Sequence, residues 1–195
     1  IRETFGKDMA LYADANGYYE DVSEAIRVGK LLQDYNYNYF EEPVFFDWLD
    51  GTNQVADALE IPIAGGDQQH GIHAFRWLLA NDGLDIVQPD HYYFGGMIRS
   101  LKVAKMGEAM GKSCIPHLSG GFGFIYMLHL VSAMPNAGPH IEFKGYSNIP
   151  IHCPTSSLRV EDGKIKVPTG PGIGVDIDPD YIESHQVVRG NELMG

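Results

Sequence analysis

Acidic residues at the ends of apolar runs constrain the fold of this chain more than any other feature. The aromatic run 39–43 ends in two glutamates and a proline, and the proline stops a strand directly after the paired acids. A second apolar run ends in Asp14, 27 residues before Glu41, and a third ends in Asp67, 26 residues after it. Each interval fits one strand, a helix and the return, so we expect neighbouring parallel strands that present the three acids side by side.

The same unit of strand and helix continues along the chain. Three more predicted strands, the last of them over 140–143, lead to ionisable residues, which are Asp90, His117 and Glu142. Six such units predict an α/β fold, a TIM-type (β/α) barrel of which this sequence holds roughly strands 3 to 8. A complete barrel of this type needs about 250 residues, so we expect the first two strands to lie outside the sequence. We assign residues 1–175 to the partial barrel and 176–195 to a C-terminal tail.

Local signals place several helices and turns. Ser23 precedes apolar residues at helical spacing, which predicts a helix that Ser23 caps. Gly95-Gly96 and Gly111 bracket a second apolar helical pattern and are expected to open and end that helix. Asp162-Gly163 is typical of a tight turn and predicts a hairpin over 159–166.

Three carboxylates at one rim would repel one another strongly without a cation between them. Carboxylate oxygens are the ligands that a hard divalent ion such as Mg²⁺ prefers. We therefore predict that Asp14, Glu41 and Asp67 are ligands of Mg²⁺. Glu42 is the alternative to Glu41, and the alternation of side chains along the strand favours Glu41.

Asp90 and His117 form a second predicted constellation. They end neighbouring strands and are 27 residues apart, which lets the carboxylate accept a hydrogen bond from one imidazole nitrogen. That contact would orient the ring and raise its basicity, leaving the other nitrogen to take a proton. Glu142, one strand further, is expected to donate to a developing oxyanion if its neighbours keep it protonated. The alternative for Glu142 is that it braces Lys144 or a backbone amide.

Composition excludes several classes of partner. The net charge of −12 over 195 residues argues against nucleic-acid phosphates and anionic membrane surfaces. Two cysteines are too few for a disulfide framework and fit a reducing cytoplasm. The longest apolar segment, 121–134, is shorter than the roughly 20 residues that a membrane span needs.

The order and spacing of these residues resemble the enolase superfamily, in particular the C-terminal barrel portion of its mandelate racemase subgroup (mandelate racemase/muconate lactonizing enzyme-like). The segments similar to that subgroup's metal-ligand strand ends are Asp14-Ala15-Asn16, Glu41-Glu42-Pro43 and Gly66-Asp67. The segments similar to its His-Asp dyad and its last strand acid are Pro89-Asp90 with Gly95-Gly96, His117 and Glu142. The resemblance runs from about Met9 to Val175.

This sequence departs from the subgroup's pattern in two ways. Its third predicted metal ligand is Asp67, where the subgroup usually has a glutamate that is one methylene longer. The Lys-x-Lys motif of the second barrel strand and the N-terminal α+β capping domain are absent from the sequence. Both lie, in the subgroup, before the part that this sequence resembles.

The resemblance implies an Mg²⁺-dependent acid-sugar dehydratase, a hydro-lyase. Such an enzyme removes the proton alpha to a carboxylate through a metal-stabilised enediolate and eliminates water to give a 2-keto-3-deoxy acid. His117 would be the base, or the acid that assists departure of the β-hydroxyl, and Asn16 and Gln68 would bind the polyhydroxylated substrate. The alternatives are a racemase or epimerase with the same site, and an inactive partial-barrel fragment. A homo-oligomer is expected from the subgroup.

Overall fold

The computed structural model describes residues 1–118, 120–145 and 150–185. Its helices and strands, in chain order, are α1 (Arg2–Phe5), β1 (Tyr12–Asp14), α2 (Val22–Asp34), β2 (Tyr39–Glu41), α3 (Leu49–Ala58), β3 (Ile63–Gly65), α4 (Ile72–Ala80), β4 (Ile86–Val87), α5 (Met97–Ala109), β5 (Ser113–Cys114), α6 (Gly123–Ser132), β6 (Ile151–His152), β7 (Asp176–Ile177) and α7 (Pro179–Glu183).

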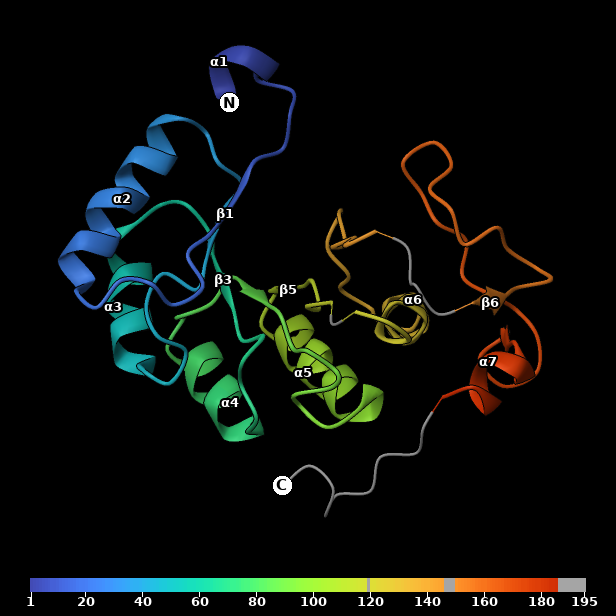
Figure 1. Ribbon diagram of the computed structural model, residues 1–195. Helices are drawn as coiled ribbons and strands as arrows, with labels where there is room; N and C mark the ends of the chain where they lie inside the picture. The colour runs from blue at the N-terminus through green and yellow to red at the C-terminus, as the bar shows by residue number, and fades with distance from the viewer. Residues whose placement is uncertain (119, 146–149, 186–195) are drawn as a thin grey trace.

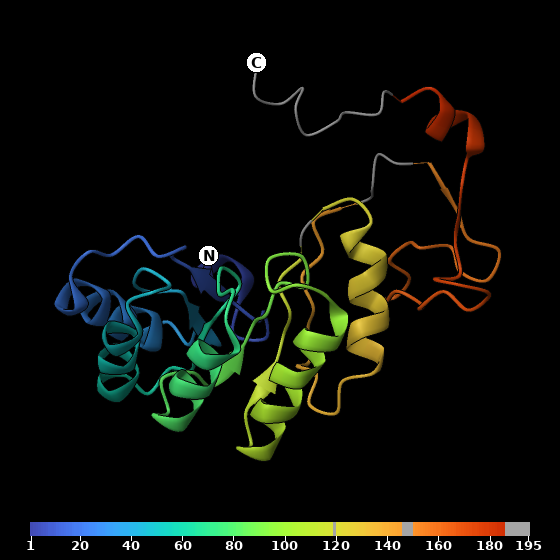
Figure 2. The ribbon, with the colours of Figure 1, turned by 90° about the horizontal axis from the view of Figure 1, so that it is seen from below.

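Strands β1 to β5 form one parallel sheet in chain order, so each strand pairs with the next one along the sequence. Helices α2 to α6 lie in an arc outside these strands, and the sheet curves inside the arc (Figure 1). The view from below shows α4, α5 and α6 side by side, each beside its strands (Figure 2). This is part of a TIM-type barrel, which confirms the predicted fold class.

Two layers of apolar packing follow from the alternation of side chains along the strands. Phe40, Ile63 and Val87 point toward the helices, where they belong to the main core with buried helix residues such as Phe75 and Val103. The residues next to them in the strands face the other way, into the barrel; they are Tyr39, Ala64 and Ile86, which cluster with Ile115 and Ile141. Both faces of the sheet are thus covered, as parallel sheets require.

The segment 140–143, predicted as the last strand, does not pair as one. Its neighbourhood joins the sheet through a single parallel bridge, between Cys114 and Ala137. Gly138 donates its backbone amide to the Cys114 carbonyl, 3.0 Å away, which holds this segment against β5. The prediction of a sixth strand is therefore wrong for the described residues, although the chain still passes the expected position.

Other local predictions have mixed outcomes. The predicted hairpin is confirmed: Glu161 and Lys164 exchange two backbone hydrogen bonds around a turn in which Asp162 and Gly163 both have positive φ. The prediction that Ser23 caps α2 is wrong, because the side chain of Asp21 accepts from the Ser23 amide and Asp21 is the N-cap. The predicted tail begins with β7 and α7, and its residues 186–195 lie outside the described residues.

No helix in the described ranges is long and apolar enough to cross a membrane. Cys114 and Cys153 are both free thiols.

Gly66, at the end of β3, is a position where only glycine fits. Its φ is +109°, and a Cβ added there would lie 2.4 Å from Cε1 of the buried Phe75 ring. We expect Gly66→Ala to lower the free energy of unfolding by about 2 to 4 kcal/mol, from backbone strain and overpacking together. Urea denaturation measures the change. Gly71→Ala is the matched control, because a Cβ there has no atom within 4 Å, and a loss of similar size in both variants would contradict the prediction.

Candidate active site at the carboxyl ends of the strands

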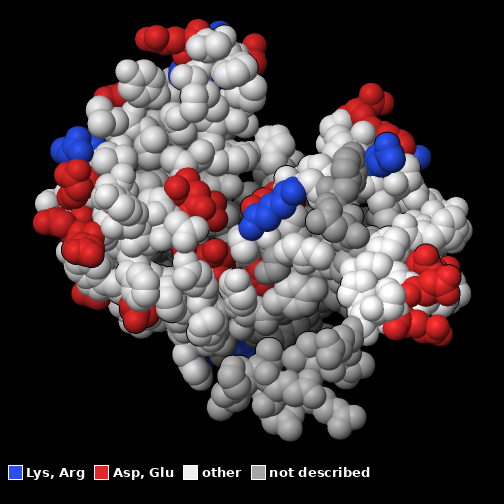
Figure 3. All heavy atoms as spheres, in the orientation of Figure 1, with Lys and Arg blue, Asp and Glu red and all other residues white. Residues whose placement is uncertain are grey.

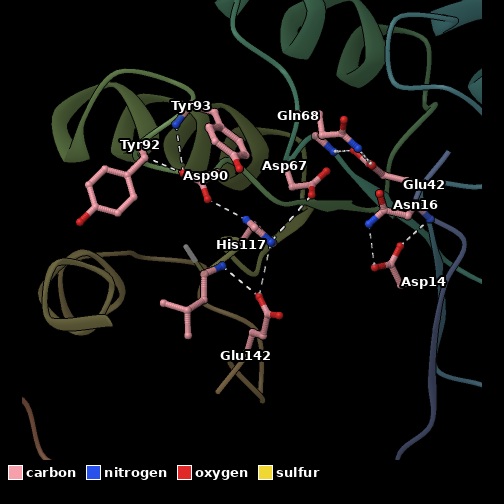
Figure 4. Close-up of polar contacts among 12 residues, drawn as sticks. Asp14, Asn16, Glu42, Asp67, Gln68, Asp90, Tyr92, Tyr93, His117 and Glu142 are labelled. Atoms are coloured by element: carbon pink, nitrogen blue, oxygen red, sulfur yellow. Dashed lines mark hydrogen bonds and ion pairs between the residues drawn. The ribbon is translucent and has the colours of Figure 1, made fainter. Parts of the chain in front are cut away.

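The predicted site residues gather at one rim of the sheet. Asp14 and Glu41 are the last residues of β1 and β2 and are directly paired in register. Asp67, Asp90 and His117 follow β3, β4 and β5 within a few residues. Because all five strands are parallel, their carboxyl ends share this rim. Figure 4 shows Asp67, Asp90 and Glu142 around His117, while Asp14 lies beside Asn16.

Asp90 and His117 form the predicted pair. The His117 Nδ1 lies 2.6 Å from Asp90 Oδ2, and the Asp90 side chain is fully buried. The other carboxylate oxygen of Asp90 accepts the backbone amides of Tyr92 and Tyr93 at 2.6 and 3.1 Å. A carboxylate held in this way fixes the orientation of the imidazole, with the hydrogen on Nδ1 and the lone pair on Nε2.

The Nε2 atom of His117 faces the middle of the rim. It lies 3.9 Å from Asp67 Oδ2 and 3.9 Å from Glu142 Oε2, and the ring stacks against Tyr93 at 6.4 Å between centroids (Figure 4). Burial and the Lys144 ammonium lower the pKa of the imidazole, whereas the hydrogen bond to Asp90 and the charges of Asp67 and Glu142 raise it. The net shift of the pKa is upward. The arrangement suits a base that accepts a proton at Nε2.

Glu142 contacts both groups named in the alternative to the oxyanion role, a backbone amide and Lys144. Its Oε2 accepts the Leu118 amide at 2.9 Å, and its Oε1 lies 3.2 Å from the Lys144 ammonium. The expectation that Glu142 is protonated and donates to an oxyanion stays a prediction.

The first two predicted metal ligands differ in their surroundings. Asp14 is exposed and accepts the Asn16 backbone amide at 2.7 Å, while the Asn16 side chain lies 3.5 Å from its other oxygen. Glu41 is half-buried. Burial raises the pKa of Glu41 to about 7, opposed by a hydrogen bond from Gln88 and assisted by the charges of Asp14 and Asp67. Asn16, a predicted substrate residue, is thus engaged with a predicted metal ligand.

Glu42, the alternative to Glu41, is buried. Its carboxylate accepts from Gln68 Nε2 at 3.0 Å and lies near the Gly66 amide at 3.4 Å. Burial and the neighbouring Asp67 carboxylate raise the pKa of Glu42. Gln68, the other predicted substrate residue, therefore holds Glu42 in this structure.

The donors suit Mg²⁺ in kind, although they are not drawn together around one point. All three predicted ligands are carboxylates, and Oδ1 of the buried Asp67 has no hydrogen-bond partner. A buried orphan carboxylate oxygen is costly unless a cation or another partner meets it. Across the described ranges, no three acidic, histidine or cysteine side chains are close enough to enclose a metal. The predicted ligands therefore fit Mg²⁺ in two respects: their donor atoms are carboxylate oxygens, and one buried oxygen of Asp67 has no hydrogen-bond partner.

Gln88 and Tyr93 also belong to the rim and were not identified from the sequence. Gln88, just after β4, is buried and hydrogen-bonds Glu41, and Tyr93 stacks on His117. The signal for Gln88 was its place between the strand residue Val87 and Pro89, at the end where ligands collect. Tyr93 carried no comparable signal, because it lies in the loop toward α5.

Acidic atoms stand beside basic atoms near the centre of the face shown in Figure 3, and acidic patches dominate its edge. The chain carries 26 acidic and 14 basic residues, which accounts for that imbalance.

The fold and this rim define a class: a TIM-type barrel domain that carries a His-Asp pair and several carboxylates on successive strand ends. The chain belongs to the enolase C-terminal domain-like family, whose model matches residues 1–181. This confirms the resemblance to the enolase superfamily and to its C-terminal portion.

Several individual proteins are similar to this chain. The chain is 33% identical over 188 residues to an arabinonate dehydratase of Saccharolobus solfataricus, covering 95% of this chain and 50% of that protein. It is 33% identical over 192 residues to a D-galactarolactone cycloisomerase of Agrobacterium fabrum, covering 93% and 50%. A similar solved structure is a mandelate racemase/muconate lactonizing protein of Paracoccus denitrificans complexed with magnesium, with a TM-score of 0.84, 30% identity, and 94% and 50% coverage. The chain spans about half the length of these relatives.

Proposed function

We propose that the full-length protein containing this chain is an Mg²⁺-dependent acid-sugar dehydratase. The observation that carries the proposal is the His117 imidazole, whose Nδ1 is held by the buried Asp90 and whose Nε2 faces the carboxylates of Asp67 and Glu142. The relatives include dehydratases of arabinonate and of D-galactonate, which supports a sugar acid as substrate.

The predicted site residues have separate tasks in this proposal. His117 Nε2 accepts the proton from the carbon next to the substrate carboxylate, while Asp90 keeps the imidazole oriented and stabilises it when it becomes charged. The hydroxyl group on the next carbon takes up a proton and leaves as water. The resulting enol rearranges to the 2-keto-3-deoxy acid. Asn16 and Gln68 would turn from Asp14 and Glu42 toward the hydroxyl groups of the substrate.

Asp14, Glu41 and Asp67 would hold Mg²⁺. The ion supplies positive charge that acidifies the proton next to the substrate carboxylate. The magnesium complex among the similar structures supports this assignment.

The proposal is tested by incubating the full-length protein with Mg²⁺ and a panel of aldonic and aldaric acids, followed by mass spectrometry. A dehydratase gives a product lighter than its substrate by one water. A D-galactarolactone cycloisomerase is as similar to this chain as the arabinonate dehydratase, so a product of unchanged mass would favour isomerisation, epimerisation or racemisation instead.

The titration of His117 gives a pH prediction. A base must be neutral, so kcat/KM falls as the pH drops through the pKa of His117. Because the net shift of that pKa is upward, the acidic limb is expected above about 6.5, the ordinary value for histidine. In Asp90→Asn the raising hydrogen bond to a carboxylate is lost, and the pKa should move down. An NMR titration of the His117 ring in the metal-free protein measures the pKa in the wild type and in Asp90→Asn. An unchanged pKa in the variant would contradict the assignment of Asp90 as the partner of His117.

A further inference from the structure

Lys144 reaches the centre of the rim from the segment after α6. Its ammonium nitrogen lies 2.9 Å from His117 Nε2 and 3.2 Å from Glu142 Oε1. The other oxygen of Glu142 accepts the Leu118 amide, so the carboxylate that tethers the ammonium is itself held by the backbone. The lysine side chain is 47% exposed, which leaves it free to change its partner.

The contact with His117 has a consequence for substrate entry. The hydrogen of the neutral ring is on Nδ1, toward Asp90, so Nε2 offers a lone pair. An ammonium has only donors, and it therefore donates to Nε2. In the proposed reaction the substrate hydrogen must approach this same atom. Substrate and Lys144 cannot both occupy the Nε2 position.

A displaced ammonium would stay beside the reacting carbon. Glu142 Oε1 also holds Lys144, at 3.2 Å, and that contact does not involve Nε2. A sugar acid carries hydroxyl or carboxylate oxygens on the carbons next to the proton that is removed, and these are good acceptors for an ammonium. A rim rich in carboxylates also needs a cation near an anionic substrate.

We propose that Lys144 is a substrate-binding residue, which gives up the His117 Nε2 contact when a hydroxylated carboxylic acid enters and then donates to an oxygen next to the reacting carbon. This inference rests on the proposed function. It makes the site selective for acids with an oxygen at that place over acids with a bare carbon chain. The simpler reading, in which Lys144 only neutralises Glu142, predicts no change in substrate affinity.

The test compares Lys144→Met, Lys144→Arg and Lys166→Met in the full-length protein with Mg²⁺. Lys166 is an exposed lysine of the same C-terminal part of the chain and lies outside the rim. Loss of a charged hydrogen bond should raise KM about 10- to 100-fold in Lys144→Met, while kcat stays within about threefold because uniform binding is removed. Lys144→Arg should recover much of the affinity, and Lys166→Met should match the wild type.

The outcomes separate this inference from the proposed function. If the wild type dehydrates a sugar acid and Lys144→Met has the same KM, the inference is overturned while the function stands. A fall in kcat with unchanged KM also overturns it. If the wild type converts no acid, the proposed function fails, and calorimetric binding of the same acids decides: weaker binding in Lys144→Met than in Lys166→Met supports the role of Lys144, and equal or undetectable binding overturns it.

Discussion

The His117→Asn variant of the full-length protein is expected to retain its fold and to lose about 100- to 10,000-fold in kcat, the range that a general base contributes. Asparagine keeps a polar group near Asp90 but has no nitrogen that accepts a proton at neutral pH. The measurement is turnover of the sugar acid that the wild type converts. His73→Asn, a change of an exposed histidine on α4, is the matched control and should leave turnover intact.

Asp90→Asn extends this test to the partner of the base. The carboxylate that holds Nδ1 at 2.6 Å is replaced by an amide, which can present a donor to Nδ1 and favour the wrong tautomer. A loss of kcat that approaches that of His117→Asn is expected, and the double variant should be little worse than either, because the pair acts as a unit. Full turnover in a folded His117→Asn protein would remove His117 from the mechanism.

Glu41→Gln is expected to have the second large effect, on the metal. Mutation of a residue that only hydrogen-bonds a metal ligand lowers metal affinity roughly 10- to 100-fold. Replacing the ligand Glu41 itself should weaken Mg²⁺ binding by more than that. Glu42→Gln is the matched control, because Glu42 is adjacent but is turned toward Gln68 and Asp67. Calorimetry with Mg²⁺ measures both variants. A larger loss in Glu42→Gln would exchange the roles of the two glutamates, and intact binding and turnover in Glu41→Gln would end the assignment.

The same ligand makes metal binding depend on pH. Burial raises the pKa of Glu41 to about 7 when no metal is bound, so the carboxylate is largely protonated below that pH. Mg²⁺ must displace this proton, and its affinity is therefore expected to rise as the pH increases toward 7 and to level off above it. In Glu41→Gln this pH dependence should be lost along with most of the affinity.

The sheet was predictable because its signal is local and repeated. Apolar runs at near-constant spacing, each ending in an ionisable residue, specify parallel strands whose carboxyl ends share a rim. The direct pairing of Asp14 with Glu41 and the hydrogen bond between Asp90 and His117 follow from that regularity. The roles of these residues in metal binding and catalysis remain predictions.

Features that depend on distant contacts or on the exact backbone conformation were not predictable in the same way. The segment 140–143 has the composition of a strand, but its pairing is decided by how Ala137 and Gly138 meet β5. Asp21 and Ser23 are both good capping residues, and only the backbone conformation of Asp21 selects it. The contact of Lys144 with His117 joins residues 27 positions apart, and a single lysine after a short apolar run gives no signal of it.

Proton NMR of the full-length protein with Mg²⁺ and the sugar-acid panel in D₂O tests the central claim most directly. A dehydratase should yield a 2-keto-3-deoxy acid with deuterium at the carbon that lost its hydroxyl, and His117→Asn should abolish the signal. Deuterium at the carbon next to the carboxylate with no loss of water would contradict the dehydratase assignment and indicate a racemase or epimerase. No change in any acid would contradict the assignment of these substrates altogether.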